Sequence, residues 1–279
     1  MKILKIDHLH ENQRIDKYLN KLLPNAPKGF VYKMLRKKDV KVNGKRVKEN
    51  YIVQYGDEVS LFLYDDRFIA YSKETTIYEL PIQFKVIYED EHILIVDKPV
   101  GLLVQPDDHE DINVLSNQVL TYLYRKGEYD PQKDLGFTPG PVHRLDRNTS
   151  GLVIYGKDMR ALQDLNEMMK KRHCIDKKYV HPLRYGHDVT LVEVSLVTGR
   201  THQIRVHLAS QGHPVMGDRK YGDFSWNREI AKKYKLNNQF LHAYSLTFTN
   251  PFGSMKYLKD KTFISPLSGN FKKIVDDLF

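Results

Sequence analysis

The chain has 279 residues but only one cysteine and one tryptophan, and it lacks any long apolar run. The lone cysteine, Cys174, excludes an internal disulfide and a cysteine-rich zinc site. It is also a poor candidate nucleophile, because a basic run precedes it and no glycine or loop presents it. No run of roughly 18 apolar residues offers a membrane span, and the first residues lack a signal-peptide core. We therefore expect a cytoplasmic protein without a membrane segment.

The composition is typical of a globular chain, with 41% hydrophobic and 28% charged residues. The length fits two domains, or one larger domain with an added module. The net charge of +9 is uneven, since residues 1–64 hold 14 Lys and Arg against 7 Asp and Glu, and the remainder holds 30 against 28. A basic excess on a small module attracts polyphosphate, so nucleic acid is the favoured partner and an anionic membrane surface the weaker alternative.

Helical apolar spacing is seen in residues 13–23 and 28–37, followed by two alternating runs at 40–47 joined by Asn-Gly. Asn-Gly is a strong hairpin signal because both residues tolerate positive φ. With a Gly-Asp turn at 56–57 and a strand at 58–63, this pattern resembles the S4-type RNA-binding domain. The resemblance implies RNA contacts from the basic residues of the second helix and the hairpin: Lys33, Arg36, Lys37, Lys38, Lys41, Lys45 and Arg46.

Residues 65–82 have no clear periodicity, and we predict a linker there between a domain at 1–64 and a second domain at 83–279. In the second domain we expect strands at 92–97 and 190–197 and helices at 112–124 and 158–171, the last capped by Asp158. A further helix is expected to end near Gly212, with Thr201 as its N-cap. Because strands and helices alternate irregularly, the pattern favours an α+β fold over a doubly wound one.

Residues 143–151 have the sequence His-Arg-Leu-Asp-Arg-Asn-Thr-Ser-Gly, which places one carboxylate, Asp146, among basic side chains. A nearby arginine favours the ionised form of a carboxylate, and that form is the nucleophilic one. The turn formers that follow, and the apolar strand pattern at 152–155, place Asp146 on a loop before a buried strand. The alternative is a surface ion-pair cluster. The motif alone favours neither interpretation.

Residues 198–209, Thr-Gly-Arg-Thr-His-Gln-Ile-Arg-Val-His-Leu-Ala, form a second constellation. Together with residues 141–151 it resembles the RluA-type pseudouridine synthase family. Further matches to that family are Asp-Lys-Pro-Val-Gly at 97–101, Lys-Lys-Tyr at 177–179, residues 212–218 and Leu-His-Ala at 241–243. The resemblance runs from Glu89 to the carboxyl end. Residues 28–32 and 35–37 look closest to the RluC-type enzymes of large-subunit ribosomal RNA.

This resemblance implies a pseudouridine synthase fold, with a mixed, mainly antiparallel sheet and flanking helices. It implies that Asp146 is the nucleophile, that Arg205 is its ion-pair partner, and that Tyr179 stacks on the target base and relays its C5 proton. Arg144 would fill the gap left when the uridine is flipped out of its helix. With Arg144, His143 and Arg147 complete the RNA contacts expected near the nucleophile. No cofactor and no metal are implied, and we expect a monomer.

Alternatives to a pseudouridine synthase, and to ribosomal RNA as its substrate, stay open. Only residues 180–197 separate Tyr179 from the second constellation, where the family usually has several tens of residues more. A non-catalytic RNA-binding or ribosome-assembly factor is therefore one alternative, and a hydrolase of nucleosides that uses Asp146 is another. Ribosomal RNA is the favoured substrate, and transfer RNA stays open because no simple side-chain code reads RNA sequence. A metal site at His143, His202 and His207 is disfavoured, because carboxylate or cysteine partners are lacking.

Overall fold

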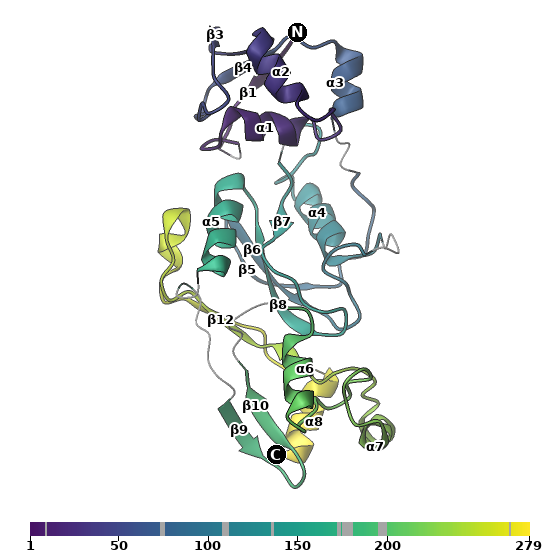
Figure 1. Ribbon diagram of the computed structural model, residues 1–279. Coiled ribbons are helices and arrows are strands. Elements are labelled where there is room, and N and C mark those ends of the chain that lie inside the picture. The colour runs from purple at the N-terminus through teal and green to yellow at the C-terminus, as the bar shows by residue number, and fades with distance from the viewer. Residues whose placement is uncertain are drawn as a thin grey trace.

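The computed structural model describes residues 1–8, 10–72, 76–107, 112–134, 137–171, 174, 181–194, 200–267 and 269–279. The molecule is elongated (Figure 1), with an amino-terminal module at one end and a sheet with flanking helices in the middle. The carboxyl-terminal helices and a protruding hairpin form the other end. No helix within the described ranges is both long and apolar enough to cross a membrane.

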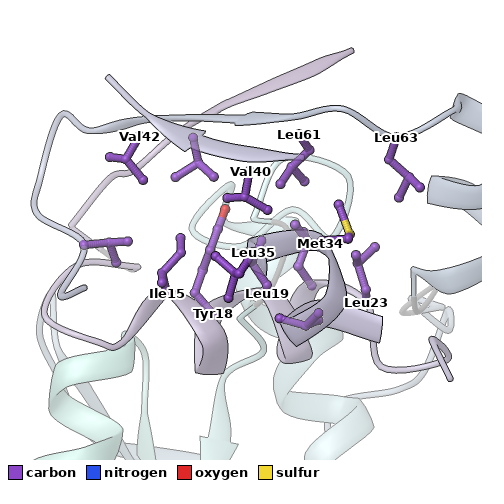
Figure 2. Close-up of a cluster of buried hydrophobic side chains, with 14 of the residues drawn as sticks. Ile15, Tyr18, Leu19, Leu23, Met34, Leu35, Val40, Val42, Leu61 and Leu63 are labelled. Atoms are coloured by element: carbon purple, nitrogen blue, oxygen red, sulfur yellow. The ribbon is translucent and has the colours of Figure 1, made fainter. Parts of the chain in front are cut away.

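The amino-terminal module is a four-stranded antiparallel sheet covered by two helices. The strands are β1 (Lys2–Lys5), β2 (Val40–Val42), β3 (Lys45–Arg46) and β4 (Glu58–Leu61), in the order β1-β4-β2-β3. Figure 2 shows apolar side chains of α1 (Ile15–Leu22) and α2 (Phe30–Lys37) packed against the sheet. Asn43 and Gly44 have φ angles of 51° and 74°, which confirms the predicted Asn-Gly hairpin.

The helix α3 (Asp65–Tyr71) lies where the sequence predicted the start of a linker. Its Phe68 is buried in the same core as the sheet and helices of the amino-terminal module. The sequence pattern missed this helix because a single buried side chain gives no periodic signal. The domain limits of 1–64, 65–82 and 83–279 stay a prediction, and the packing of Phe68 groups α3 with the amino-terminal module.

A mixed, mainly antiparallel sheet forms the centre of the molecule, as predicted. Its strands are β5 (Lys85–Glu89), β6 (Ile93–Lys98), β7 (Gly140–Pro141), β8 (Ser150–Gly156) and β11 (His242–Ala243). The order is β11-β8-β6-β5, with β7 also on β8, and only the pair β11–β8 is parallel. Side chains of β6 and β8 alternate between two cores, so Ile93 and Ile95 face α5 (Met159–Lys170) while Leu94 and Val96 face α4 (Leu115–Arg125).

Asp158 caps α5 as predicted, since its side chain accepts a hydrogen bond from the Ala161 N–H. The remaining elements are β9 (His181–Tyr185), β10 (Thr190–Glu193), α6 (Gln203–Ser210), α7 (Phe224–Tyr234), β12 (Ser245–Thr247), a 3-10 helix (Gly253–Leu258), β13 (Thr262–Ile264) and α8 (Gly269–Leu278). Within the shortened stretch noted in the sequence, residues 181–193 form the β9–β10 hairpin. The expected strand at 190–197 is seen as far as Glu193, and residues 195–199 lie outside the described residues.

Candidate active site

Asp146 lies on the loop that joins β7 to β8, next to the central sheet. Its neighbour Leu145 packs against the core on the α4 side, and the Asp146 carbonyl accepts a hydrogen bond from the Thr149 N–H at 3.0 Å. At the end of the loop Gly151 has φ 108° and touches the β11 backbone, so closely that a Cβ there would lie 2.3 Å from the Ala243 oxygen. Only glycine fits such a position. The loop is therefore anchored at both sides of the carboxylate.

Arg205 connects Asp146 to a second carboxylate. Its Nη1 donates to Asp146 Oδ2 at 3.1 Å, while its Nε and Nη2 donate to Asp218 Oδ2 and Oδ1 at 2.7 and 2.9 Å. Asp218 is fully buried, and the Asp146 side chain keeps 28% of its surface exposed. No donor among the described residues reaches Asp146 Oδ1. The arrangement is a partly accessible carboxylate with one oxygen held by Arg205 and the other without a hydrogen bond from the described residues.

The charges of this trio support one another. Burial alone raises the pKa of Asp218, but the hydrogen bonds from Arg205 and from the N–H groups of Lys220 and Tyr221 outweigh it and hold that pKa below its ordinary value. Hydrogen bonds to Asp218, and then to Asp146, raise the pKa of Arg205. The guanidinium is thus permanently charged between two carboxylates, and the bidentate contact with Asp218 fixes its orientation.

His202 lies close to the same carboxylate oxygen of Asp146 as Arg205 does. Its Nε2 lies 3.7 Å from Asp146 Oδ2, and its Nδ1 lies 3.2 Å from the Tyr221 hydroxyl. The sequence predicted Thr201 as the cap of this helix, which is wrong, because His202 is the residue at the N-cap of α6 and makes no side-chain cap hydrogen bond. The φ angle of His202 is 55°, in the left-handed region, whereas an ordinary N-cap residue has an extended backbone. In this conformation the imidazole lies near Asp146.

Lys98 links strand β6 to the loop that carries Asp146. This lysine at the end of β6 is fully buried, and its Nζ donates to the carbonyls of Pro99, Leu102 and Arg147 at 2.8, 2.7 and 3.1 Å. Burial lowers the pKa of Lys98 to about 7, while the charges of Asp146 and Asp97 oppose that shift. The contact with the Arg147 carbonyl ties β6 to the residue that follows Asp146.

Replacing Lys98 by Met is expected to destabilise the fold by about 2–4 kcal/mol, because three buried carbonyls lose their donor. The lowered pKa also gives a pH signature. Between pH 7 and the ordinary value of 10.5 the unfolded chain binds more protons, so wild-type stability rises with pH relative to the variant. Urea unfolding at pH 7 and pH 9 measures both effects. Lys85→Met, at an exposed position on β5, is the control, and an equal pH dependence in wild type and Lys98→Met would contradict the assignment.

The basic residues predicted to contact RNA around Asp146 have different environments. Arg144 is exposed, whereas Arg147 is half-exposed and lies 3.5 Å from Asp107. His143 is partly buried, its Nε2 accepts a hydrogen bond from the Ile154 N–H at 3.3 Å, and burial lowers its pKa to about 4. His143 is therefore neutral near pH 7 and links the loop to β8, so any contact it makes with RNA is not that of a cation.

The predicted RNA contacts of the amino-terminal module lie on α2, directly after it, and on the hairpin strands β2 and β3. Lys33, Arg36 and Lys37 are exposed on α2, whose apolar face packs on the sheet. The others follow α2 or belong to the hairpin strands, and they are Lys38, Lys41, Lys45 and Arg46. Tyr179 falls outside the described residues. Its predicted role stays a prediction.

Sequence reasoning missed three residues that surround the predicted pair. Asp218 and Lys98 lie in segments that match the family, but the sequence pattern suggested no role for either. It suggested His202 only as a metal ligand. Among the described residues no group of three or more His, Cys, Asp or Glu side chains is arranged to hold a metal ion. A buried arginine needs a buried counter-charge, and the partly exposed Asp146 supplies only part of it. A search for a second carboxylate partner of Arg205 is the signal that would have pointed to Asp218.

Comparison with known proteins decides the family. The RNA pseudouridylate synthase family matches residues 92–183 and 179–210, and the S4 domain matches residues 13–59. Ribosomal large subunit pseudouridine synthase C of Escherichia coli is 31% identical over 300 residues, covering 90% of this chain and 89% of that protein. The chain belongs to the RNA pseudouridine synthase family. It is thus an isomerase with an RNA substrate, and the S4 domain predicted from the sequence is confirmed.

Other relatives agree with this assignment. An uncharacterised RNA pseudouridine synthase of Mycoplasma genitalium is 33% identical, over 85% of this chain and 86% of its own length. Ribosomal large subunit pseudouridine synthase C of Buchnera aphidicola is 28% identical over 96% of this chain. Among solved structures, human RNA pseudouridylate synthase domain containing 4 is 18% identical, with a TM-score of 0.48 over 68% of this chain and 91% of that one.

Proposed function

We propose that this pseudouridine synthase isomerises specific uridines of large-subunit ribosomal RNA, with Asp146 as its nucleophile. The observation that carries the chemistry is the ion pair between Asp146 and Arg205, because it holds one carboxylate oxygen and leaves the other available. The substrate assignment is supported by relatives named as large-subunit enzymes, which match most of the chain. The pair also argues against a factor that only binds RNA, because binding alone would not require it.

In the proposed reaction Asp146 attacks C1′ of the ribose or the uracil ring of a flipped uridine. The bond from N1 to C1′ breaks, the uracil rotates, and a bond from C5 to C1′ forms. Arg205 holds Asp146 in position before the attack and stabilises the carboxylate when it is released. We further propose that Tyr179 stacks on the target base and that the exposed Arg144 fills the space left by the flipped nucleotide. We place the enzyme in the cytoplasm as a monomer.

A map of pseudouridines in RNA from cells with and without the protein tests the substrate. Loss of pseudouridine at one or more large-subunit ribosomal positions is the expected result. Loss confined to transfer RNA would contradict the ribosomal assignment. A parallel measurement of free uracil separates isomerisation from hydrolysis, because a hydrolase would release the base while an isomerase retains it.

The basic face of α2 gives a further prediction. Replacing Lys33, Arg36 and Lys37 together by Gln is expected to weaken RNA binding and to reduce the slope of log K against log salt by about 2, because fewer counterions are released. Binding at several salt concentrations measures the slope. The same replacement of Lys272 and Lys273, exposed on α8, is the control. An unchanged slope in the α2 variant would show that this face does not contact phosphates.

A further inference from the structure

The backbone of His202 has a conformation that non-glycine residues adopt rarely. Its φ and ψ are 55° and 21°, in the left-handed region, directly before the first residue of α6. Such positions carry strain and are concentrated at functional sites, where the surrounding structure maintains them. Here the result is that an imidazole, 25% exposed, faces the carboxylate of Asp146. Arg205, one turn further along α6, reaches the same carboxylate oxygen.

The two ring nitrogens of His202 have different surroundings. Nδ1 lies within hydrogen-bond distance of the Tyr221 hydroxyl, and the two rings meet edge to face with centroids 5.7 Å apart. Tyr221 is itself held, because its N–H donates to Asp218 and its ring lies 5.3 Å from the Arg205 guanidinium. Nε2 points toward Asp146 Oδ2 at 3.7 Å, which is beyond a normal hydrogen bond. When Nδ1–H donates to the hydroxyl, Nε2 carries a lone pair directed at the reaction centre.

The last step of the proposed reaction requires a base that removes the proton from C5 of the uracil. Once C5 of the uracil is joined to C1′, C5 still carries its hydrogen and N1 is part of a C6–N1 double bond. The C5–H bond must break, with its electron pair forming the C5–C6 double bond, while the C6–N1 π pair takes up a proton at N1. One proton leaves C5 and one arrives at N1, so the step balances without an oxidant or a cofactor. Reacting atoms lie about 3–3.5 Å from the attacking oxygen, and Nε2 lies 3.7 Å from the second oxygen of the same carboxylate.

We propose that His202 is the general base that removes the C5 proton, through Nε2, with Tyr221 fixing the ring. This inference rests on the proposed role of Asp146 as the nucleophile. Asp146 is a free carboxylate again after the C5–C1′ bond has formed, and at 3.7 Å it stabilises the imidazolium that results. His202 then returns the proton to solvent or to N1. The family resemblance implies that Tyr179 relays the C5 proton, so His202 and Tyr179 are alternative candidates for the base.

His202→Asn is the first test. Asparagine tolerates positive φ, and its side-chain amide occupies the place of Nδ1 beside Tyr221, so the variant lacks only the nitrogen that faces Asp146. We expect kcat to fall by about 10²–10⁴-fold, with RNA affinity unchanged. RNA carrying deuterium at C5 of uridine supplies the decisive readout. If deprotonation is slowed, a primary isotope effect larger than that of the wild type must accompany the loss of rate.

Three comparisons keep the result interpretable. His207→Asn changes an exposed histidine of the same helix and should leave rate and isotope effect unaltered. His202→Gly keeps the left-handed backbone, and added imidazole should restore part of its activity. If Tyr179→Phe raises the isotope effect and His202→Asn does not, the proposal is overturned. It is also overturned if His202→Asn reacts at the wild-type rate. Retained isomerisation by Asp146→Asn would instead overturn the proposed role of Asp146.

Discussion

Asp146→Asn is expected to lower pseudouridine formation by at least about 10⁴-fold, which corresponds to about 5.5 kcal/mol of transition-state stabilisation. The amide is a poor nucleophile, and the other carboxylate of the described residues that contacts Arg205, Asp218, is fully buried. The fold should persist, because Asp146 is partly exposed and Arg205 keeps both hydrogen bonds to Asp218. Mass-spectrometric quantification of pseudouridine in modified RNA measures the loss.

RNA binding separates catalysis from recognition in this variant. The substitution removes one negative charge from a site that faces a polyanion, so affinity should be equal to that of wild type or slightly higher. Asp276→Asn, at an exposed position on α8, is the matched control and should be fully active. If Asp146→Asn still isomerised uridine while Asp276→Asn behaved as wild type, the nucleophile would have to be sought elsewhere.

Much of the fold follows from local sequence patterns. The alternation of side chains in residues 93–96 places them in two cores, as a strand buried on both faces requires, and Asn43-Gly44 determines a hairpin. These features depend on neighbours in the chain. The pairing of Asp146 with Arg205, 59 residues apart, came only from the family resemblance, because nothing in either local pattern refers to the other.

The rest of the site could not be predicted for the same physical reason. Asp218 and His202 acquire their roles from a buried guanidinium and an unusual φ angle, and neither leaves a periodic trace in the sequence. His143 shows the converse. Its place among arginines suggests a cation, but burial and a backbone hydrogen bond make it a neutral structural group. Charge in a motif therefore predicts the chemistry of a side chain less well than its surroundings do.

Asp218→Asn is expected to destabilise the enzyme by about 3–5 kcal/mol, because it leaves the Arg205 guanidinium buried without its main counter-charge. The amide nitrogen would also face an N–H donor of Arg205, so the bidentate contact is lost. Arg205 then no longer holds Asp146 in place, and misplacement of a reacting group by about 1 Å costs about 10²-fold in rate. We expect kcat to fall by that factor at temperatures where the variant is folded, with KM little changed.

The split between kcat and KM separates positioning from a general loss of structure. Asp158→Ala removes another buried carboxylate, the cap of α5, and should cost about 1 kcal/mol of stability without lowering kcat.

Because the pKa of Asp218 is lowered, its contribution to stability is complete above the ordinary value of 3.8 and is lost as pH falls through the folded-state value. The stability difference between wild type and Asp218→Asn should therefore shrink in acid. A constant difference from pH 6 to pH 3 would mean that the carboxylate of Asp218 is not paired with Arg205 in solution.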